Sequence, residues 1–153
     1  MTNSIVLGTG SYAPQRILSN ADLEKIVKTN NEWIVSRTGI KERRVAADHE
    51  ATSDLAAAAG KEALQFAGVK PDDVDMLVVC TVTGDTPTPS CASFVQAQLG
   101  ASNAFAFDVG AACAGSLYGL SIADQFIRSG KGKRALVIGA ETLSRFVDWT
   151  HRE

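Results

Sequence analysis

The sequence has few histidines and no long apolar runs, and these shortages exclude several classes of protein. No apolar run approaches the length of a transmembrane helix. The N-terminus lacks the basic segment and long apolar segment of a signal peptide. His49 and His151 have no companions at metal-ligand spacing, so no metal site is expected. We expect a cytoplasmic protein without membrane contact.

The charge and the cysteine content exclude further classes of protein. The formal net charge of −2 gives no general affinity for polyanions, so nucleic acid is not an expected partner. The three cysteines lack the paired spacing of a disulfide framework. Gly8-Thr-Gly10 resembles the start of a dinucleotide-binding loop, but Ala13 stands where the third glycine is needed. A globular domain of 153 residues with a sizeable core remains.

Apolar runs alternate with amphipathic segments along the chain. This alternation predicts an α/β fold with a parallel or mixed sheet that helices cover on both faces. The segment 41–46 is a short strand or a loop. Expected strands are 4–7, 76–82, 104–109 and 134–139, and expected helices are 21–28, 31–36, 54–67, 90–99 and a segment after residue 113.

Small residues surround Cys113 in the run Asp108-Val-Gly-Ala-Ala-Cys113-Ala-Gly. Cys113 lies between an expected strand and an expected helix, where the unpaired N–H groups and the helix dipole favour a nucleophilic thiolate. Core packing is an equal alternative on composition alone, because a free cysteine usually acts as a small hydrophobe. Cys80 ends an expected buried strand, and Cys91 lacks glycine-rich neighbours. Both are therefore weaker candidates for a nucleophile than Cys113.

A second candidate site is the segment 31–38, in which Trp33 and Arg37 lie four residues apart. On a helix these two side chains share a face. An indole can stack on a purine and a guanidinium can hold a phosphate. The residues alone favour the other interpretation, in which Trp33 belongs to the core.

Four segments resemble the β-ketoacyl-acyl-carrier-protein synthase III family of the thiolase superfamily. They are Gly8-Thr-Gly-Ser-Tyr12, Glu32-Trp-Ile-Val-Ser-Arg-Thr-Gly-Ile-Lys-Glu-Arg43, Phe107-Asp-Val-Gly-Ala-Ala-Cys-Ala-Gly115 and Asp148-Trp-Thr-His-Arg152. The resemblance covers the whole chain and implies that residues 1–153 are the N-terminal half of a thiolase-like fold. The family's catalytic His and Asn belong to the second half, so the resemblance implies an incomplete active site here.

The resemblance implies an acyltransferase that starts type II fatty-acid synthesis. Cys113 would take the acyl group of acetyl-CoA or another short acyl-CoA. Malonyl-acyl-carrier protein would then lose carbon dioxide, and its carbanion would attack the acyl-cysteine. CoA enters as part of a substrate, so no cofactor is expected, and the complete protein would be a homodimer.

The resemblance also implies roles for seven other residues. Trp33 and Arg152 would sandwich the adenine of CoA, with Arg37 and Thr38 at the nucleotide end. The acyl pocket would be lined by Val82, Thr88 and Leu143. Many members carry Phe where this chain has Thr88, so we expect tolerance of primers longer than acetyl.

Two alternatives stay open at this point. The first is a related condensing enzyme of secondary metabolism that makes quinolones or polyketides, since acceptor specificity would lie largely in the second half. The second is a non-catalytic half-subunit that binds CoA or pairs with a separate second half. An isolated half would also expose the apolar surface of helices that normally meet the other half, and this surface would promote association.

Overall fold

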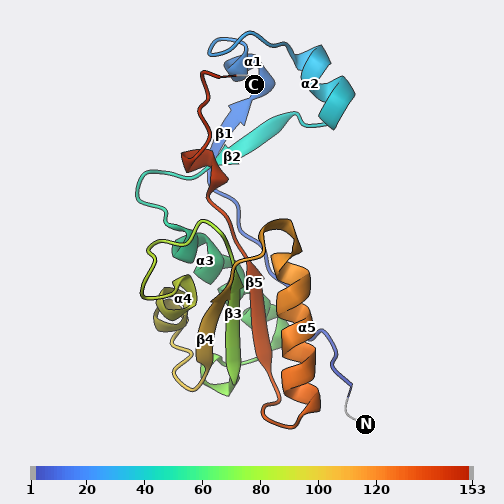
Figure 1. The fold of residues 1–153 in the computed structure, drawn as a ribbon, viewed down its shortest axis with the longest axis vertical. Coiled ribbons are helices and arrows are strands. Elements are labelled where there is room, and N and C mark those ends of the chain that lie inside the picture. The colour runs from blue at the N-terminus through green and yellow to red at the C-terminus, as the bar shows by residue number, and fades with distance from the viewer. Residues whose placement is uncertain (1–2, 152–153) are drawn as a thin grey trace. The chain divides into compact units, whose positions relative to one another are not determined.

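The computed structural model describes residues 3–151, which form two compact units. Of these residues, 3–12 and Ala51–Glu141 form the sheet unit, and Ala13–Glu50 and 142–151 form the ribbon unit (Figure 1). Within the described residues, no helix combines the length and the apolar character needed to cross a membrane. Each unit has its own core, so each is described separately.

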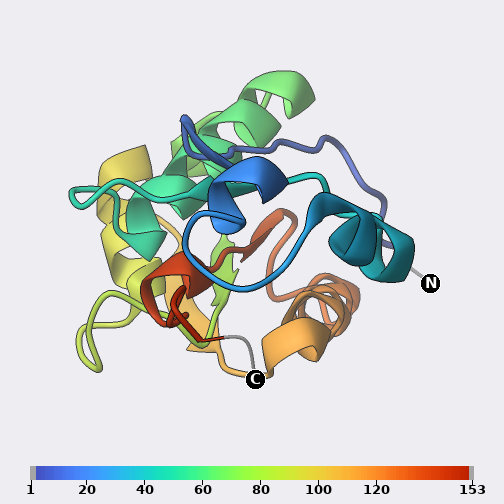
Figure 2. The ribbon, with the colours of Figure 1, turned by 90° about the horizontal axis from the view of Figure 1, so that it is seen from above.

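Three parallel strands form the centre of the sheet unit. They are β3 (Met76–Cys80), β4 (Phe105–Val109) and β5 (Ala135–Gly139), arranged in the order β4-β3-β5. Helices α3 (Thr52–Ala67) and α4 (Cys91–Leu99) cover one face, and α5 (Gly115–Arg128) covers the other, as Figure 2 shows. The short 3₁₀ turns η1 (Pro71–Asp73) and η2 (Ala112–Ala114) precede β3 and α5. The expected α/β fold with helices on both faces is confirmed.

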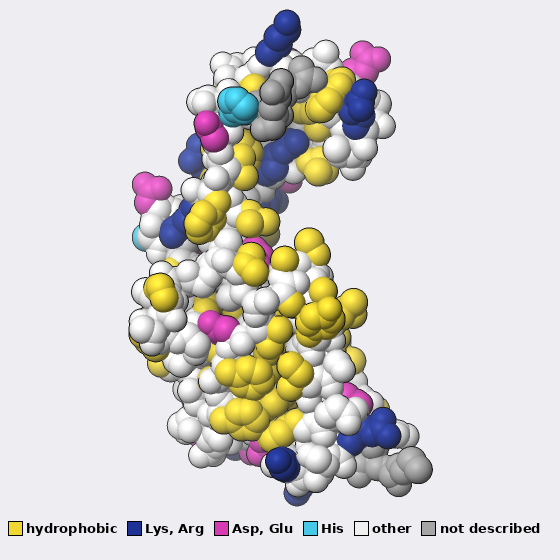
Figure 3. All heavy atoms as spheres, in the orientation of Figure 1, with side chains coloured by type: hydrophobic (Ala, Val, Ile, Leu, Met, Phe, Trp, Pro, Cys, Tyr) yellow, Lys and Arg dark blue, Asp and Glu magenta, His cyan; other side chains and the backbone are white. Residues whose placement is uncertain are grey.

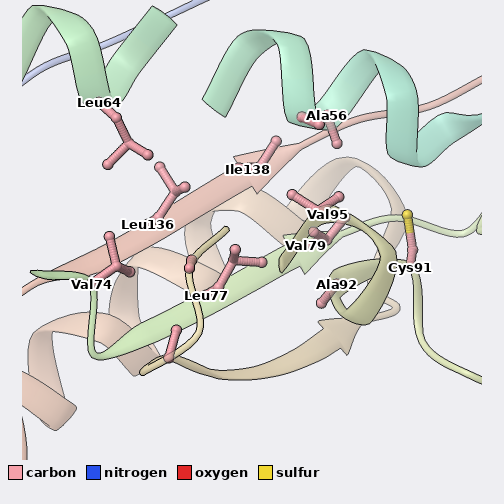
Figure 4. Packing of buried hydrophobic residues seen from close by; sticks show 13 residues of the cluster. Ala56, Leu64, Val74, Leu77, Val79, Cys91, Ala92, Val95, Leu136 and Ile138 are labelled. Carbon is pink, nitrogen blue, oxygen red and sulfur yellow. The ribbon is translucent and has the colours of Figure 1, made fainter. Parts of the chain in front are cut away.

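The larger core lies between the sheet and helices α3 and α4. Leu77 and Val79 of β3 are fully buried, and Leu136 and Ile138 of β5 lie beside them (Figure 4). Helix α3 contributes Ala56 and Leu64, and α4 contributes Val95. Burial of each large apolar side chain contributes about 1.5–3 kcal/mol to folding. This core therefore fixes the sheet that supports Cys113.

Helix α5 approaches the other face of the sheet through two glycines. A Cβ on Gly115 would lie 3.1 Å from Cys80 Cβ. A Cβ on Gly119 would lie 2.7 Å from Cys80 Sγ and 2.8 Å from Val137 Cγ1, which is closer than real Cβ contacts. Gly115 and Gly119 are one helical turn apart, so they share the face that packs on β3. These glycines set how closely the start of α5 lies to the sheet.

The outward face of α5 is apolar and exposed. Leu117, Tyr118 and Leu120 are all more than half exposed. Figure 3 shows hydrophobic side chains gathered over the strands and α5 on the visible face of the sheet unit. The sequence predicts such exposed apolar helix surface, and α5 has it. Contiguous apolar surface of this kind promotes association.

The ribbon unit is built around two short antiparallel strands, β1 (Arg16–Ser19) and β2 (Glu42–Val45). Between them lie helices α1 (Asn20–Leu23) and α2 (Asn31–Thr38), and the turn η3 (Leu143–Arg145) follows in the second segment of the unit. Its small core comprises Leu18, Leu23, Ile34 and Val45, with Trp149 packed against them. Both parallel and antiparallel pairing therefore occur in this fold, in separate sheets.

Two expectations from the sequence are wrong. Residues 4–7 form no strand, because Gly8 and Gly10 pack the N-terminal segment directly on the α3 backbone. A Cβ on Gly10 would lie 2.3 Å from the carbonyl oxygen of Ala59, so this close approach needs glycine. The helix expected over 21–28 ends at Leu23, and the strand that precedes it, β1, was not expected.

The close approach of α5 predicts the effect of adding one methyl group. Gly119→Ala should lower the free energy of unfolding by about 1–3 kcal/mol, because Cys80 and Val137 are short side chains that cannot withdraw. Chemical denaturation measures this difference. The matched control, Ser121→Ala on the exposed side of α5, should stay within about 0.5 kcal/mol of the unchanged protein. Equal stability of the two variants would contradict the packing argument.

Candidate active site

Cys113 lies in the short connection between β4 and α5. It occupies the middle of η2, and its side chain is exposed. Ala112, the residue before it, has φ of +43°, in the left-handed region that residues with a Cβ rarely adopt. Such a conformation costs about 1–3 kcal/mol and is commonly found at functional sites. The predicted position of Cys113 between a strand and a helix is confirmed.

The N-terminus of α5 has no side-chain cap. Its N-cap residue, Ala114, provides no side-chain hydrogen bond, and the first turn carries no acidic residue. The N–H groups at a helix start carry partial positive charge. A developing oxyanion near this helix start is therefore favoured.

Cys91 shows the opposite arrangement at the N-terminus of α4. The Asp108 carboxylate accepts hydrogen bonds from the backbone N–H groups of Cys91 and Ala92, both at 2.7 Å. Burial, together with the carboxylates of Asp85 and Asp108, raises the pKa of the Cys91 thiol to about 12. Because Cys91 is fully buried and a carboxylate already caps this helix start, we expect its thiol to be a structural residue.

Cys80 is also buried, at the end of β3. Burial raises the pKa of its thiol, and its side chain packs under Gly115 and Gly119 of α5. Cys80 is therefore a packing residue, as its position in an apolar strand predicts. Among the three cysteines, only the Cys113 side chain is exposed.

Glu141 orders the loop that follows β3. Its carboxylate accepts hydrogen bonds from the Val82 backbone N–H at 2.9 Å, from the Thr81 hydroxyl at 3.2 Å and from the Thr83 hydroxyl. Val82 is exposed, as is Thr88 further along this loop. Leu143, the third predicted pocket residue, is exposed in the ribbon unit.

Helix α2 carries the predicted CoA contacts. The Arg37 guanidinium carbon lies 5.0 Å from the centre of the Trp33 ring, so the two side chains share a face as predicted. Trp33 is partly exposed, which argues against a core residue. The Thr38 hydroxyl donates to the Ile34 carbonyl at 2.7 Å and accepts from the Ile40 N–H at 3.1 Å. Arg152 lies outside the described residues.

Several residues that order the candidate segments within each unit were not identified from the sequence. They are Asp108, which caps α4, Glu141, which holds the loop at Val82, and Asn20, which contacts both ends of α2. A carboxylate within the apolar run 104–109 was a possible signal for Asp108. Among residues 3–151, no group of three or more His, Cys, Asp or Glu side chains is placed to hold a metal ion.

Comparison with known proteins assigns this fold to thiolase-like condensing enzymes. The structure matches 3-oxoacyl-[acyl-carrier-protein] synthase III from Aquifex aeolicus with a TM-score of 0.93 and 52% identity, over 99% of this chain and 48% of the other. It also matches the priming β-ketosynthase of the R1128 polyketide pathway, with a TM-score of 0.93 and 40% identity, over 96% of this chain and 44% of the other.

The sequence matches agree with the structural ones. The β-ketoacyl-[acyl-carrier-protein] synthase III of Thiobacillus denitrificans is 58% identical over 99% of this chain, and that of Caldanaerobacter subterraneus is 57% identical over 96%. The profile of the family described as 3-oxoacyl-[acyl-carrier-protein (ACP)] synthase III matches residues 107–153. The chain therefore matches β-ketoacyl-[acyl-carrier-protein] synthase III proteins over 96–99% of its residues. It spans 48% and 44% of the length of these two relatives.

The difference in burial among the three cysteines predicts selective alkylation. Iodoacetamide at about pH 8 should add one carbamidomethyl group to the folded chain, on Cys113, because alkylation requires an accessible thiolate. Denaturation should allow all three cysteines to react. Intact mass and peptide mapping measure both results. Cys113→Ala should remove the adduct from the folded chain, and labelling of Cys91 there would contradict the structure.

Proposed function

We propose that this chain is the acyl-accepting half of a synthase that starts type II fatty-acid synthesis. The observation that carries the proposal is the exposed Cys113 at the uncapped start of α5. In the first step, the Cys113 thiolate attacks the carbonyl of an acyl-CoA thioester, and the CoA thiolate leaves. The Cys113 backbone N–H would stabilise the oxyanion formed between these events.

The second step is a decarboxylative condensation. Malonyl-acyl-carrier protein loses carbon dioxide, and the resulting carbanion attacks the acyl-cysteine. The Cys113 thiolate leaves, and 3-oxoacyl-acyl-carrier protein is released. The resemblance assigns stabilisation of the carbanion to a His and an Asn of the second half of the fold. We therefore assign the acylation step to residues 1–153, whereas the condensation step requires both halves of the fold.

The remaining assignments concern substrate binding and assembly. We assign Trp33, Arg37, Thr38 and Arg152 to CoA, and the ordered Trp33–Arg37 pair supports this role. The exposure of Val82 and Thr88 is compatible with an acyl pocket. The whole protein would be a cytoplasmic homodimer whose substrates are acetyl-CoA, or another short acyl-CoA, and malonyl-acyl-carrier protein, with no further cofactor.

A role in secondary metabolism is the second candidate. The 40% identity to a polyketide priming β-ketosynthase supports it, because that enzyme shares this fold over 96% of the chain. Both candidates use the same acylation step on Cys113. They differ in the acyl carrier protein that supplies the malonyl group, so condensation assays with the two classes of carrier protein would distinguish them.

The proposed acylation predicts a covalent adduct. Incubation with acetyl-CoA should add one acetyl group to the intact mass of the chain, and hydroxylamine should remove it, because thioesters are cleaved readily. Cys113→Ser should lose the thioester adduct, whereas Cys80→Ala should keep it, since Cys80 is buried. A chain that binds CoA and forms no adduct would favour the non-catalytic half-subunit instead.

The small side chain at position 88 predicts broad primer acceptance. We expect acylation by octanoyl-CoA at a rate similar to that by acetyl-CoA, measured as adduct formation over time in the intact enzyme. Thr88→Phe should lower the octanoyl rate by roughly 10-fold or more relative to the acetyl rate, because the added ring fills pocket volume. Thr88→Ser is the matched control. A strict acetyl preference of the unchanged protein would contradict this prediction.

A further inference from the structure

Asn20 is a buried side chain that contacts both ends of α2. Its exposed fraction is 2%. The side-chain amide nitrogen donates to Asn31 Oδ1 and to the Ile40 carbonyl oxygen, each at 2.9 Å. Asn31 is the first residue of α2, and Ile40 follows Gly39, the residue that ends this helix. One amide group therefore holds the two ends of an eight-residue helix.

The orientation of this amide is fixed by Arg43. The Arg43 guanidinium, from β2, donates a hydrogen bond to Asn20 Oδ1. Arginine has no acceptor, so the atom it contacts must be the oxygen, and the nitrogen must face α2. The backbone N–H of Asn20 donates to the Lys41 carbonyl at 3.2 Å. Every donor and acceptor of the buried side chain has a partner, as burial of an amide requires.

Helix α2 depends on such polar contacts because it buries little apolar surface. Ile34 is its one buried residue, and isolated helices of this length are unstable in water. Its N-terminus is held by Asn30, whose side chain accepts from the Trp33 N–H at 2.7 Å, and by Glu24, which accepts from the Asn31 N–H at 2.7 Å. Asn20 is the residue that joins this end of the helix to the other.

We propose that Asn20 is a positioning residue for the nucleotide end of CoA. It does not touch the ligand but holds α2 so that Trp33 and Arg37 are ordered before CoA arrives. This inference rests on the proposed assignment of CoA to α2. A surface that is ordered in advance loses less conformational entropy on binding. Asn20 therefore raises the affinity for CoA without contacting it.

The isosteric substitution Asn20→Asp tests this role. The carboxylate still accepts from Arg43 but cannot donate to Asn31 or to Ile40. We expect calorimetric titration with CoA to show about 10-fold weaker binding, and hydrogen exchange to show faster exchange of the α2 amides. The matched control is Ser19→Ala, which removes the cap of α1 in the same unit and leaves the contacts of Asn20 with α2 in place. It should keep CoA affinity within about 2-fold.

The two readouts separate failure of this inference from failure of the proposed function. Both are recorded at a temperature where circular dichroism shows each variant folded. Equal CoA affinity of the unchanged chain and Asn20→Asp, or unchanged exchange of the α2 amides, would overturn the positioning role alone. Absence of CoA binding by the unchanged chain would overturn the CoA site itself, and the positioning role with it.

Discussion

Complete burial of β3 is the constraint on which the sheet unit depends. Leu77, Val78 and Val79 have no exposed surface, so this strand needs a neighbouring strand on each edge and a helical layer on each face. Side chains that point to one face meet α3 and α4, and those that point to the other meet α5. The parallel register then brings the carboxyl ends of β3, β4 and β5 to one edge. The loops that carry Val82, Cys113 and Glu141 all begin at that edge.

Buried strands and long helices were the parts that the sequence predicted well. The expected strands 76–82, 104–109 and 134–139 correspond to β3, β4 and β5, and the expected helix 54–67 corresponds to α3. Continuous apolar runs specify strands covered on both faces, and Gly68 ends α3 at φ of +63° as a helix-ending glycine should. The position of Cys113 between a strand and a helix belongs to this group, because it follows from a local apolar run.

The contacts that the sequence did not predict join distant residues. Strand β1 is partly polar and exists because it pairs with β2, from Arg16 opposite Val45 to Ser19 opposite Glu42. The hydrogen bond from the Thr81 hydroxyl to Glu141 joins residues 60 positions apart, and that from the Cys91 N–H to Asp108 joins residues 17 apart. No local pattern distinguishes these carboxylates from exposed ones. The apolar run 4–7 has the composition of a strand but forms none, because strand propensity cannot form a strand without a pairing partner.

The starts of α4 and α5 differ in a way that favours a structural role for Cys91 and leaves a nucleophilic role open to Cys113. Helices α4 and α5 each follow a sheet strand, and each has a cysteine at or just before its first residue. At α4, Asp108 fills the anion site that the helix start creates, so a second negative charge on Cys91 is repelled. At α5, alanine and glycine leave that site without a side chain, and Cys113 is exposed. The prediction that Cys113 is the reactive thiol therefore rests on its exposure and on the absence of a side-chain cap at the start of α5.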